Sequence, residues 1–144
     1  MSETTAPTET MSAMNDVVEQ VIGLVNGMSV FATMTRGALP TGPGLVCEPG
    51  PTTPNEVYLD KGQYIPLDLT INGKHSNLKT LSNDMALIFE DLTRRKTYPS
   101  GTGWQIVDIA AYTWPEVIRR ESNNQWLMAG ALSVRYYLTG SDNE

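Results

Sequence analysis

The sequence predicts an α+β fold, in which an antiparallel or mixed β-sheet is covered on one face by two main α-helices. Three observations lead to this prediction. Two segments repeat apolar residues with the period of a helix, several others have the alternation or the β-branched and aromatic content of strands, and Pro- and Gly-rich stretches separate them. The helices come before and between the strands, as in folds where helices pack on one side of a sheet.

The first helix is expected over residues 14–26. Its apolar side chains recur at helical spacing, and Gly27 is placed to end it in a left-handed conformation. Residues 1–13 are small, polar and acidic, so we expect a disordered N-terminal tail there. The stretch 28–35, rich in β-branched and aromatic residues, predicts a strand directly after the helix.

A dense run of prolines and glycines follows between residues 36 and 56. Leu45 to Glu48 could form a second short strand, but the prolines on both sides, Pro43, Pro49 and Pro51 among them, fix φ and remove backbone donors. We therefore predict exposed loops around that strand. Residues 57–59 and 64–71 then predict a hairpin, with Pro66 at an edge or a gap in pairing and Asn72-Gly73 closing the second arm.

The clearest element is a helix over residues 77–96, with Ser76 or Asn77 as its cap. Its apolar stripe consists of Leu78, Leu81, Met85, Ile88, Phe89 and Leu92. Residues 104–113 are apolar on both alternations, which favours a central strand or one covered on both faces, ended by Trp114-Pro115. After a charged connection, residues 125–139 predict a last strand with a bulge or bend at Gly130.

Composition bounds the class of protein. The chain has 144 residues, 40% of them apolar, a net charge of −6 and a single cysteine. These values predict one domain over residues 14–140, a disordered end at 141–144, and no disulfide. We expect neither a membrane span nor a secretory signal. The acidic balance disfavours general binding to nucleic acid.

No pattern in the sequence predicts catalysis. His75 is the only histidine and is expected to be a solvated turn residue, and neighbouring Glu90 and Asp91 fit a solvated helix face. Nucleophile, zinc and phosphate-loop motifs are absent from the sequence. We therefore predict no enzyme, no cofactor and no metal. Trp114, beside a proline, fits an interface, because large aromatic residues anchor protein contacts.

The order of these segments resembles the small minor capsid or tail-completion proteins of tailed bacteriophages, which belong with the tail terminators. The segments that carry the likeness are DKGQYIPLDLTINGKHSN (60–77), the helix to Arg95, YPSGTGWQIVDI (98–109) and RESNNQWLMAGALSVRYYL (120–138). The resemblance implies a structural protein that forms a homo-oligomeric, typically hexameric, ring on the last disc of the tail tube. Such a ring stops tube polymerisation and meets the head-completion or connector protein. It implies assembly in the host cytoplasm and a final place in the virion, at the head–tail junction.

Under this reading, the last strand uses both of its faces, one against the helices and one in the assembly. The expected interface residues are Pro43, Pro49, Pro51, Trp114, Arg119, Arg120 and Arg135. Arg135 could touch DNA in the channel, although pairing with a carboxylate is the favoured role. The alternative is a small-molecule- or peptide-binding α+β domain, or a minor enzyme with an unrecognised site. A deep apolar pocket in a monomer would favour that alternative.

Overall fold

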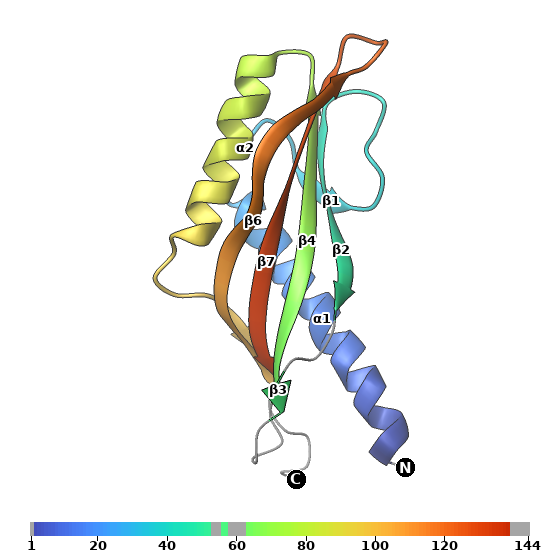
Figure 1. The fold of residues 1–144 in the computed structure, drawn as a ribbon, viewed down its shortest axis with the longest axis vertical. Helices are drawn as coiled ribbons and strands as arrows, with labels where there is room; N and C mark the ends of the chain where they lie inside the picture. Colours follow the sequence, from blue (N-terminus) through green and yellow to red (C-terminus); the bar gives the residue numbers. More distant parts are fainter. Residues whose placement is uncertain (1, 53–55, 58–62, 139–144) are drawn as a thin grey trace.

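The computed structural model describes residues 2–52, 56–57 and 63–138 (Figure 1). Their strands form a seven-stranded sheet of order β1-β2-β4-β7-β6-β5, with β3 paired to β4. The β1–β2 pair is parallel and the other pairs are antiparallel, so the sheet is mixed. Apolar residues of both helices join one core with the inward side of the sheet. The predicted α+β fold with two helices on one face is thus confirmed.

Helix α1 (Ser2–Asn26) begins twelve residues before the predicted start at Met14. Its apolar stripe is Ala13, Val17, Val18, Val21, Ile22 and Val25, all of them buried. Once those packed turns have formed, each further residue costs little to add, which accounts for helical backbone where the composition suggested a tail. Disorder of residues 1–13 in the free subunit stays a prediction. No helix among the described residues is both long and apolar enough to cross a membrane.

The strand expected at 28–35 is wrong for most of its length, because β1 spans only Met34–Arg36. In the preceding loop, side chains form the hydrogen bonds to the backbone that strand pairing would otherwise supply. The Asn26 amide accepts a hydrogen bond from the Met34 N–H at 2.7 Å and donates to the Met34 carbonyl at 3.2 Å. The Phe31 N–H donates to the Asp84 carboxylate at 2.8 Å. These contacts satisfy the backbone without strand pairing.

Strand β2 (Gly44–Thr52) runs through Pro49, Gly50 and Pro51, where exposed loops were expected. Pairing with β1 ends at Cys47, so the remainder of β2 faces β4 on one side only. A proline on the unpaired side of an edge strand costs no hydrogen bond to a neighbouring strand. A register shift between Pro49 and Thr52 interrupts the pairing with β4 at the two prolines. The density of prolines therefore marks an edge strand here.

Strands β3 (Glu56–Val57) and β4 (Gln63–His75) form the predicted hairpin; its turn lies outside the described residues. Pro66 pairs with Arg135 of β7, while on its other side it falls between the registers of β3 and β2, consistent with a gap. The strand does not end at Asn72-Gly73. A Cβ at Gly73 would lie 2.9 Å from both Leu81 and Met85, so glycine lets helix α2 approach β4 closely.

Helix α2 (Leu78–Thr93) confirms the second predicted helix. The Asn77 side chain accepts from the Thr80 N–H at 3.1 Å and caps its start. The predicted stripe is buried at Leu81, Met85, Ile88, Phe89 and Leu92.

Strands β5 (Ser100–Gly101), β6 (Trp104–Arg120) and β7 (Trp126–Leu138) complete the sheet. Strand β6 passes through Trp114-Pro115, where it was expected to stop, and it is not central. Only Trp104 and Gln105 pair with β5, so the rest of β6 is an edge strand that tolerates Pro115. Strand β7 lies between β4 and β6 as a long central strand, with its predicted inward side facing the helices.

Gly130 lies opposite an irregular stretch of β6. Its pairing with β4 is regular, and the predicted bulge lies across from it in β6, between Thr113 and Glu116. A Cβ at Gly130 would lie 2.6 Å from the Phe89 ring and 3.0 Å from the Pro115 nitrogen. The Phe89 ring therefore occupies the volume that a side chain at residue 130 would need.

We expect Gly130→Ala to lower the free energy of unfolding by about 1 to 3 kcal/mol, as other overpacked core sites do. In a Phe89→Leu background the same change should cost less, because the ring that it meets is gone; a double-mutant cycle in denaturant measures this coupling. Gly23→Ala is the matched control. Nothing lies within 4 Å of a Cβ at Gly23, in the exposed face of α1. Equal costs in both backgrounds would contradict the proposed contact with Phe89.

Candidate functional site

The predicted interface residues lie on separate elements of the sheet and do not form one site. Pro43 is exposed in the loop before β2, and Pro49 and Pro51 lie within β2 itself. Trp114, Arg119 and Arg120 lie on β6, in a strand and not in loops. Arg135 lies on the face of β7 that points away from the helices.

The most distinctive surface is the free edge of β6. Four register shifts interrupt its pairing with β7. The residues left without a partner at these shifts include Val107, Tyr112, Trp114 and Ile118. These side chains are 36%, 76%, 52% and 47% exposed, respectively. Each irregularity of the strand therefore places a large apolar side chain in solvent.

We call this surface the β6 edge patch and define it as Val107, Tyr112, Trp114, Val117 and Ile118. Val117, at 45% exposure, completes it. Of these residues, the sequence prediction included only Trp114. The signal for the others was present, because residues 104–113 are apolar on both alternations, but it was attributed to burial on both faces. Bulges on an exposed edge produce the same pattern, since each extra residue shifts the alternation by one.

Trp114 is tied to the core as well as to the edge. Its ring lies 6.0 Å from the ring of Phe89, centroid to centroid, at an angle of 43°. This spacing is within the range of favourable aromatic pairs. Half of the side chain still faces solvent, so the contact with Phe89 orients an exposed aromatic anchor.

At one end of the sheet, the hairpin between β6 and β7 meets the loop of residues 37–43. The Lys74 ammonium, on β4, forms an ion pair with the Glu121 carboxylate at 2.9 Å and donates to the Pro40 carbonyl at 3.2 Å. The Asn123 amide donates to the Thr41 carbonyl at 2.8 Å. The structure thus joins the Pro/Gly loop to the hairpin that follows Arg119 and Arg120, and fixes both over this end of the sheet.

The two arginines are held by neighbours in the same hairpin. Arg119 pairs with Glu121 at 3.1 Å, and its side chain remains 60% exposed. Arg120 donates to the Asn124 amide oxygen at 3.1 Å and lies 5.4 Å from the centre of the Trp126 ring. A guanidinium at this distance from an aromatic ring makes a cation–π contact. Both arginines are exposed and can contact another molecule.

The Lys74–Glu121 contact predicts how stability depends on pH. Hydrogen bonding to Lys74 holds the pKa of the Glu121 carboxyl below its ordinary value of 4.5, with further contributions from the charges of Lys74 and Arg119. A carboxyl with a lowered folded-state pKa stabilises the fold above pH 4.5, and this stabilisation is lost as the pH falls through the folded-state value.

We therefore expect Glu121→Gln to lower the thermal midpoint at pH 7, with the difference from the parent protein shrinking towards pH 3. Glu90→Gln, which removes an exposed carboxylate from α2, is the matched control. A difference for Glu121→Gln that is the same at pH 7 and pH 3 would contradict the assigned contact.

The sheet face that points away from the helices carries small and polar residues along its middle. Ala129, Ala131 and Ser133 of β7 lie there, opposite Asn72, Thr70 and Asp68 of β4. The guanidinium of Arg135 lies 4.5 Å from the centre of the Tyr64 ring, and Asp108 is its cross-strand neighbour on β6. The contact described for Arg135 is therefore with an aromatic face, where a carboxylate partner was favoured.

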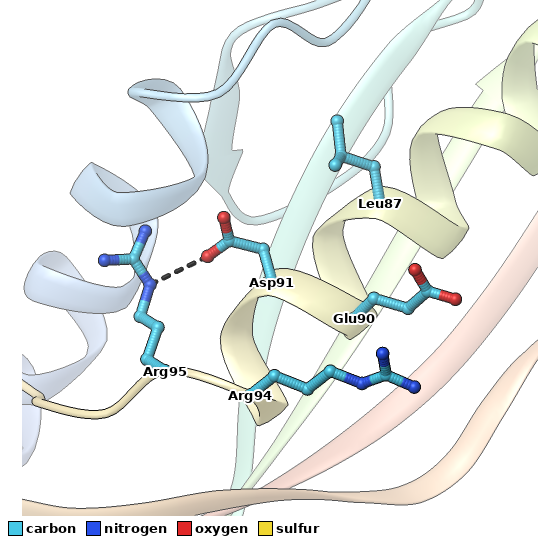
Figure 2. Close-up of a pocket in the computed structure, with 5 residues that line it drawn as sticks. All are labelled: Leu87, Glu90, Asp91, Arg94 and Arg95. Atoms are coloured by element: carbon cyan, nitrogen blue, oxygen red, sulfur yellow. Dashed lines mark hydrogen bonds and ion pairs between the residues drawn. The ribbon is translucent and has the colours of Figure 1, made fainter.

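An open groove of about 490 Å³ lies on helix α2. Leu87, Glu90, Asp91, Arg94 and Arg95 line it, and Arg95 pairs with Asp91 at 2.8 Å (Figure 2). The figure shows Leu87 and Asp91 on one side of the helix and Glu90 beside Arg94. Four of the five lining residues are charged, unlike the deep apolar pocket expected of a small-molecule-binding domain.

The cysteine and the histidine, the remaining side chains that could be reactive, pack against their neighbours in the fold. Cys47 is buried in β2, and burial raises the pKa of its thiol to about 12, so a reactive thiolate is disfavoured. His75 is the last residue of β4, where its ring packs edge-on against Phe31 and Nδ1 accepts from the Asn77 N–H at 2.9 Å. It is a packed strand end and not a solvated turn residue. The described part of the chain holds no cluster of three or more His, Cys, Asp or Glu residues suited to a metal.

No protein-family model matches this sequence, and no curated protein does. Among solved structures, a chain of the virion of a native gene transfer agent particle has a similar fold, with a TM-score of 0.57. The two chains share 16% sequence identity, and the likeness covers 88% of this chain and 96% of the other. At this identity the likeness establishes the fold, over nearly the whole of both chains.

Proposed function

We propose that this chain is a structural protein of a phage or phage-like virion, and that it acts as a tail terminator. In this role it caps the tail tube as a ring, stops tube polymerisation and forms the joint to the head connector. The observation that carries the proposal is the likeness in fold to a virion chain along nearly the full length of both chains. The segment order that resembles tail-completion proteins supports it independently.

The shape of the subunit fits a ring member. Identical heterologous contacts need two different lateral surfaces on each subunit. The sheet offers two such sides, one formed by the edge of β6 and the other by β1, the outer part of β2 and helix α1 (Figure 1). Six copies are the number that the resemblance implies.

A terminator also needs a surface that differs from its lateral sides to meet the tube or the connector. The end of the sheet where residues 37–43 are fixed to the β6–β7 hairpin is suited to this, because Lys74, Glu121 and Asn123 hold its loops in place. Loops that are already ordered lose little conformational entropy on docking. Pro43 lies on this end, where we propose that it contacts the tube or the connector, whereas Arg119 and Arg120, at the end of β6, are proposed to serve the lateral contact between copies.

The sheet face away from the helices is the proposed channel side. Its small residues, Ala129, Ala131 and Ser133, permit close approach, and Arg135 is the cation that could contact passing DNA. The chain as a whole carries a charge of −6, which limits retention of DNA in a channel.

The test is the location of the protein in purified particles. A tagged copy should be found at the head-proximal end of the tail by gold labelling in electron microscopy, and at a copy number that matches one ring. Label distributed along the tube, or absence of the protein from particles that assemble and infect normally, would overturn the proposal.

A further inference from the structure

We infer that the β6 edge patch is a lateral interface of this protein with a second copy of itself, and that it packs against the α1–β1–β2 side of that copy. The inference rests on the proposed ring and adds which two surfaces meet in it.

The patch is unlike an edge on which another strand could pair. An unprotected edge recruits strands through a row of free N–H and C=O groups, and bulges disrupt such a row. Strand β6 has four register shifts over seventeen residues, and Pro115 removes one of its donors. The occupant is therefore bound through side chains, chiefly Tyr112, Trp114 and Ile118.

The concentration of exposed apolar residues supports an interface at this place. Six large apolar side chains of the described residues are exposed, and five of them belong to β6. Large apolar residues gathered on one exposed element mark an interaction surface, whereas single exposed ones are ordinary. Tyrosine and tryptophan are also the residue types that most often dominate binding energy.

The charge distribution favours the opposite side of another copy as the occupant. Residues 13–48, which include the described side chains of α1, β1 and the first part of β2, contain Asp16, Glu19 and Glu48 against the single cation Arg36. Residues 61–144 are balanced, with nine residues of each sign. The β6 strand itself ends in two exposed arginines, Arg119 and Arg120, and carries Asp108 and Glu116 along its length.

The described exposed charges of α1, β1 and β2 are Asp16, Glu19, Arg36 and Glu48, so carboxylates outnumber the single cation on these elements. Asn15 and Asn26 of α1 both contact β1, bonding Arg36 and Met34, so Glu19, which lies between them on the same helix face, is at this edge. Glu48 is exposed where pairing with β1 ends. A contact in which the Arg119 and Arg120 end of β6 meets this side brings arginines towards carboxylates, whereas two β6 edges facing each other would bring together surfaces of the same kind.

The test uses two folded variants with opposite defects. Tyr112→Glu with Ile118→Glu places two carboxylates in the β6 edge patch, and Glu19→Lys with Glu48→Lys reverses two charges of the acidic side. The matched controls are Leu87→Glu, which changes an exposed apolar residue of α2 outside the patch, and Glu90→Lys, which reverses an exposed charge there. Circular dichroism checks the fold of every variant, and analytical ultracentrifugation measures self-association.

The parent protein and both controls should associate, while each double variant should associate at least about 30-fold more weakly. An equimolar mixture of the two double variants should form a 1:1 dimer, because each retains the surface that the other lacks. Parent-like association of the Tyr112/Ile118 variant, or a mixture that stays monomeric, would overturn the inference.

A parent protein that is monomeric at every concentration would also overturn it, and would assign the patch to a different virion protein. The proposed function would survive that result, because it is judged by the position of the protein in the particle. Conversely, self-association through these surfaces by a protein that is absent from particles would reject the function and keep the interface.

Discussion

Replacing Phe89 with alanine is expected to lower the free energy of unfolding by about 3 to 5 kcal/mol, the range found for buried aromatic truncations. Phe89 is fully buried, and its ring occupies the space over Gly130 while contacting Trp114. Gly130, which lies beneath the ring, has no side chain that could fill the space when the ring is removed. The loss of buried apolar surface and the cavity that remains therefore both lower the free energy of unfolding.

Denaturant unfolding followed by circular dichroism measures this loss. Tyr112→Ala is the control, because it removes an aromatic side chain that is 76% exposed. We expect it to change the stability of the monomer by less than about 0.5 kcal/mol, as at other surface positions. A loss of less than about 1 kcal/mol for Phe89→Ala would contradict the packing of α2 on β7.

Leu81→Ala and Ile88→Ala are each expected to cost about 2 to 5 kcal/mol. Both residues are fully buried on the inward face of α2, and Leu81 packs directly over Gly73 of β4. Leu87→Ala is the matched control on the same helix, because Leu87 is 40% exposed. Losses below about 1 kcal/mol at both buried positions would show that this stripe is not part of the core.

The elements that were predicted correctly are those that bury one face and expose the other, because this arrangement gives a regular apolar pattern in the sequence. Helix α2 has a single apolar stripe and a cap at Asn77, and β4 alternates between core and outer face, so local periodicity is sufficient to identify them. The capped start of α2 was found within one residue, since Asn77 caps the helix that begins at Leu78.

The elements that were predicted incorrectly depend on the position of a strand in the sheet. Proline was read as a stop at Pro49 and at Pro115, yet both lie in strands, because each faces an edge where no partner needs its missing N–H. Whether a strand is central or at an edge is decided by its neighbours, which are distant in sequence. The apolar residues of β6 were accordingly placed in a core, although a bulged edge exposes them.

The candidate site was predicted in part for the same reason. Prolines, Trp114 and the arginines were identified by residue type, but their grouping follows from the sheet order. That order separates β2 from β6 and brings the 37–43 loop to the β6–β7 hairpin. No local pattern encodes a contact such as that between Thr41 and Asn123, which are far apart in the chain.

The central claim is that this chain ends a tail tube and joins it to a head, and the length of tails made without it tests that claim most directly. The gene is deleted from the phage or phage-like element that carries it, and tails are measured by negative-stain electron microscopy, with the gene supplied in trans as the control. The account predicts tails that are abnormally long or that fail to join heads, and recovery of normal joined tails on complementation. Tails of normal length joined to heads in the deletion would contradict it.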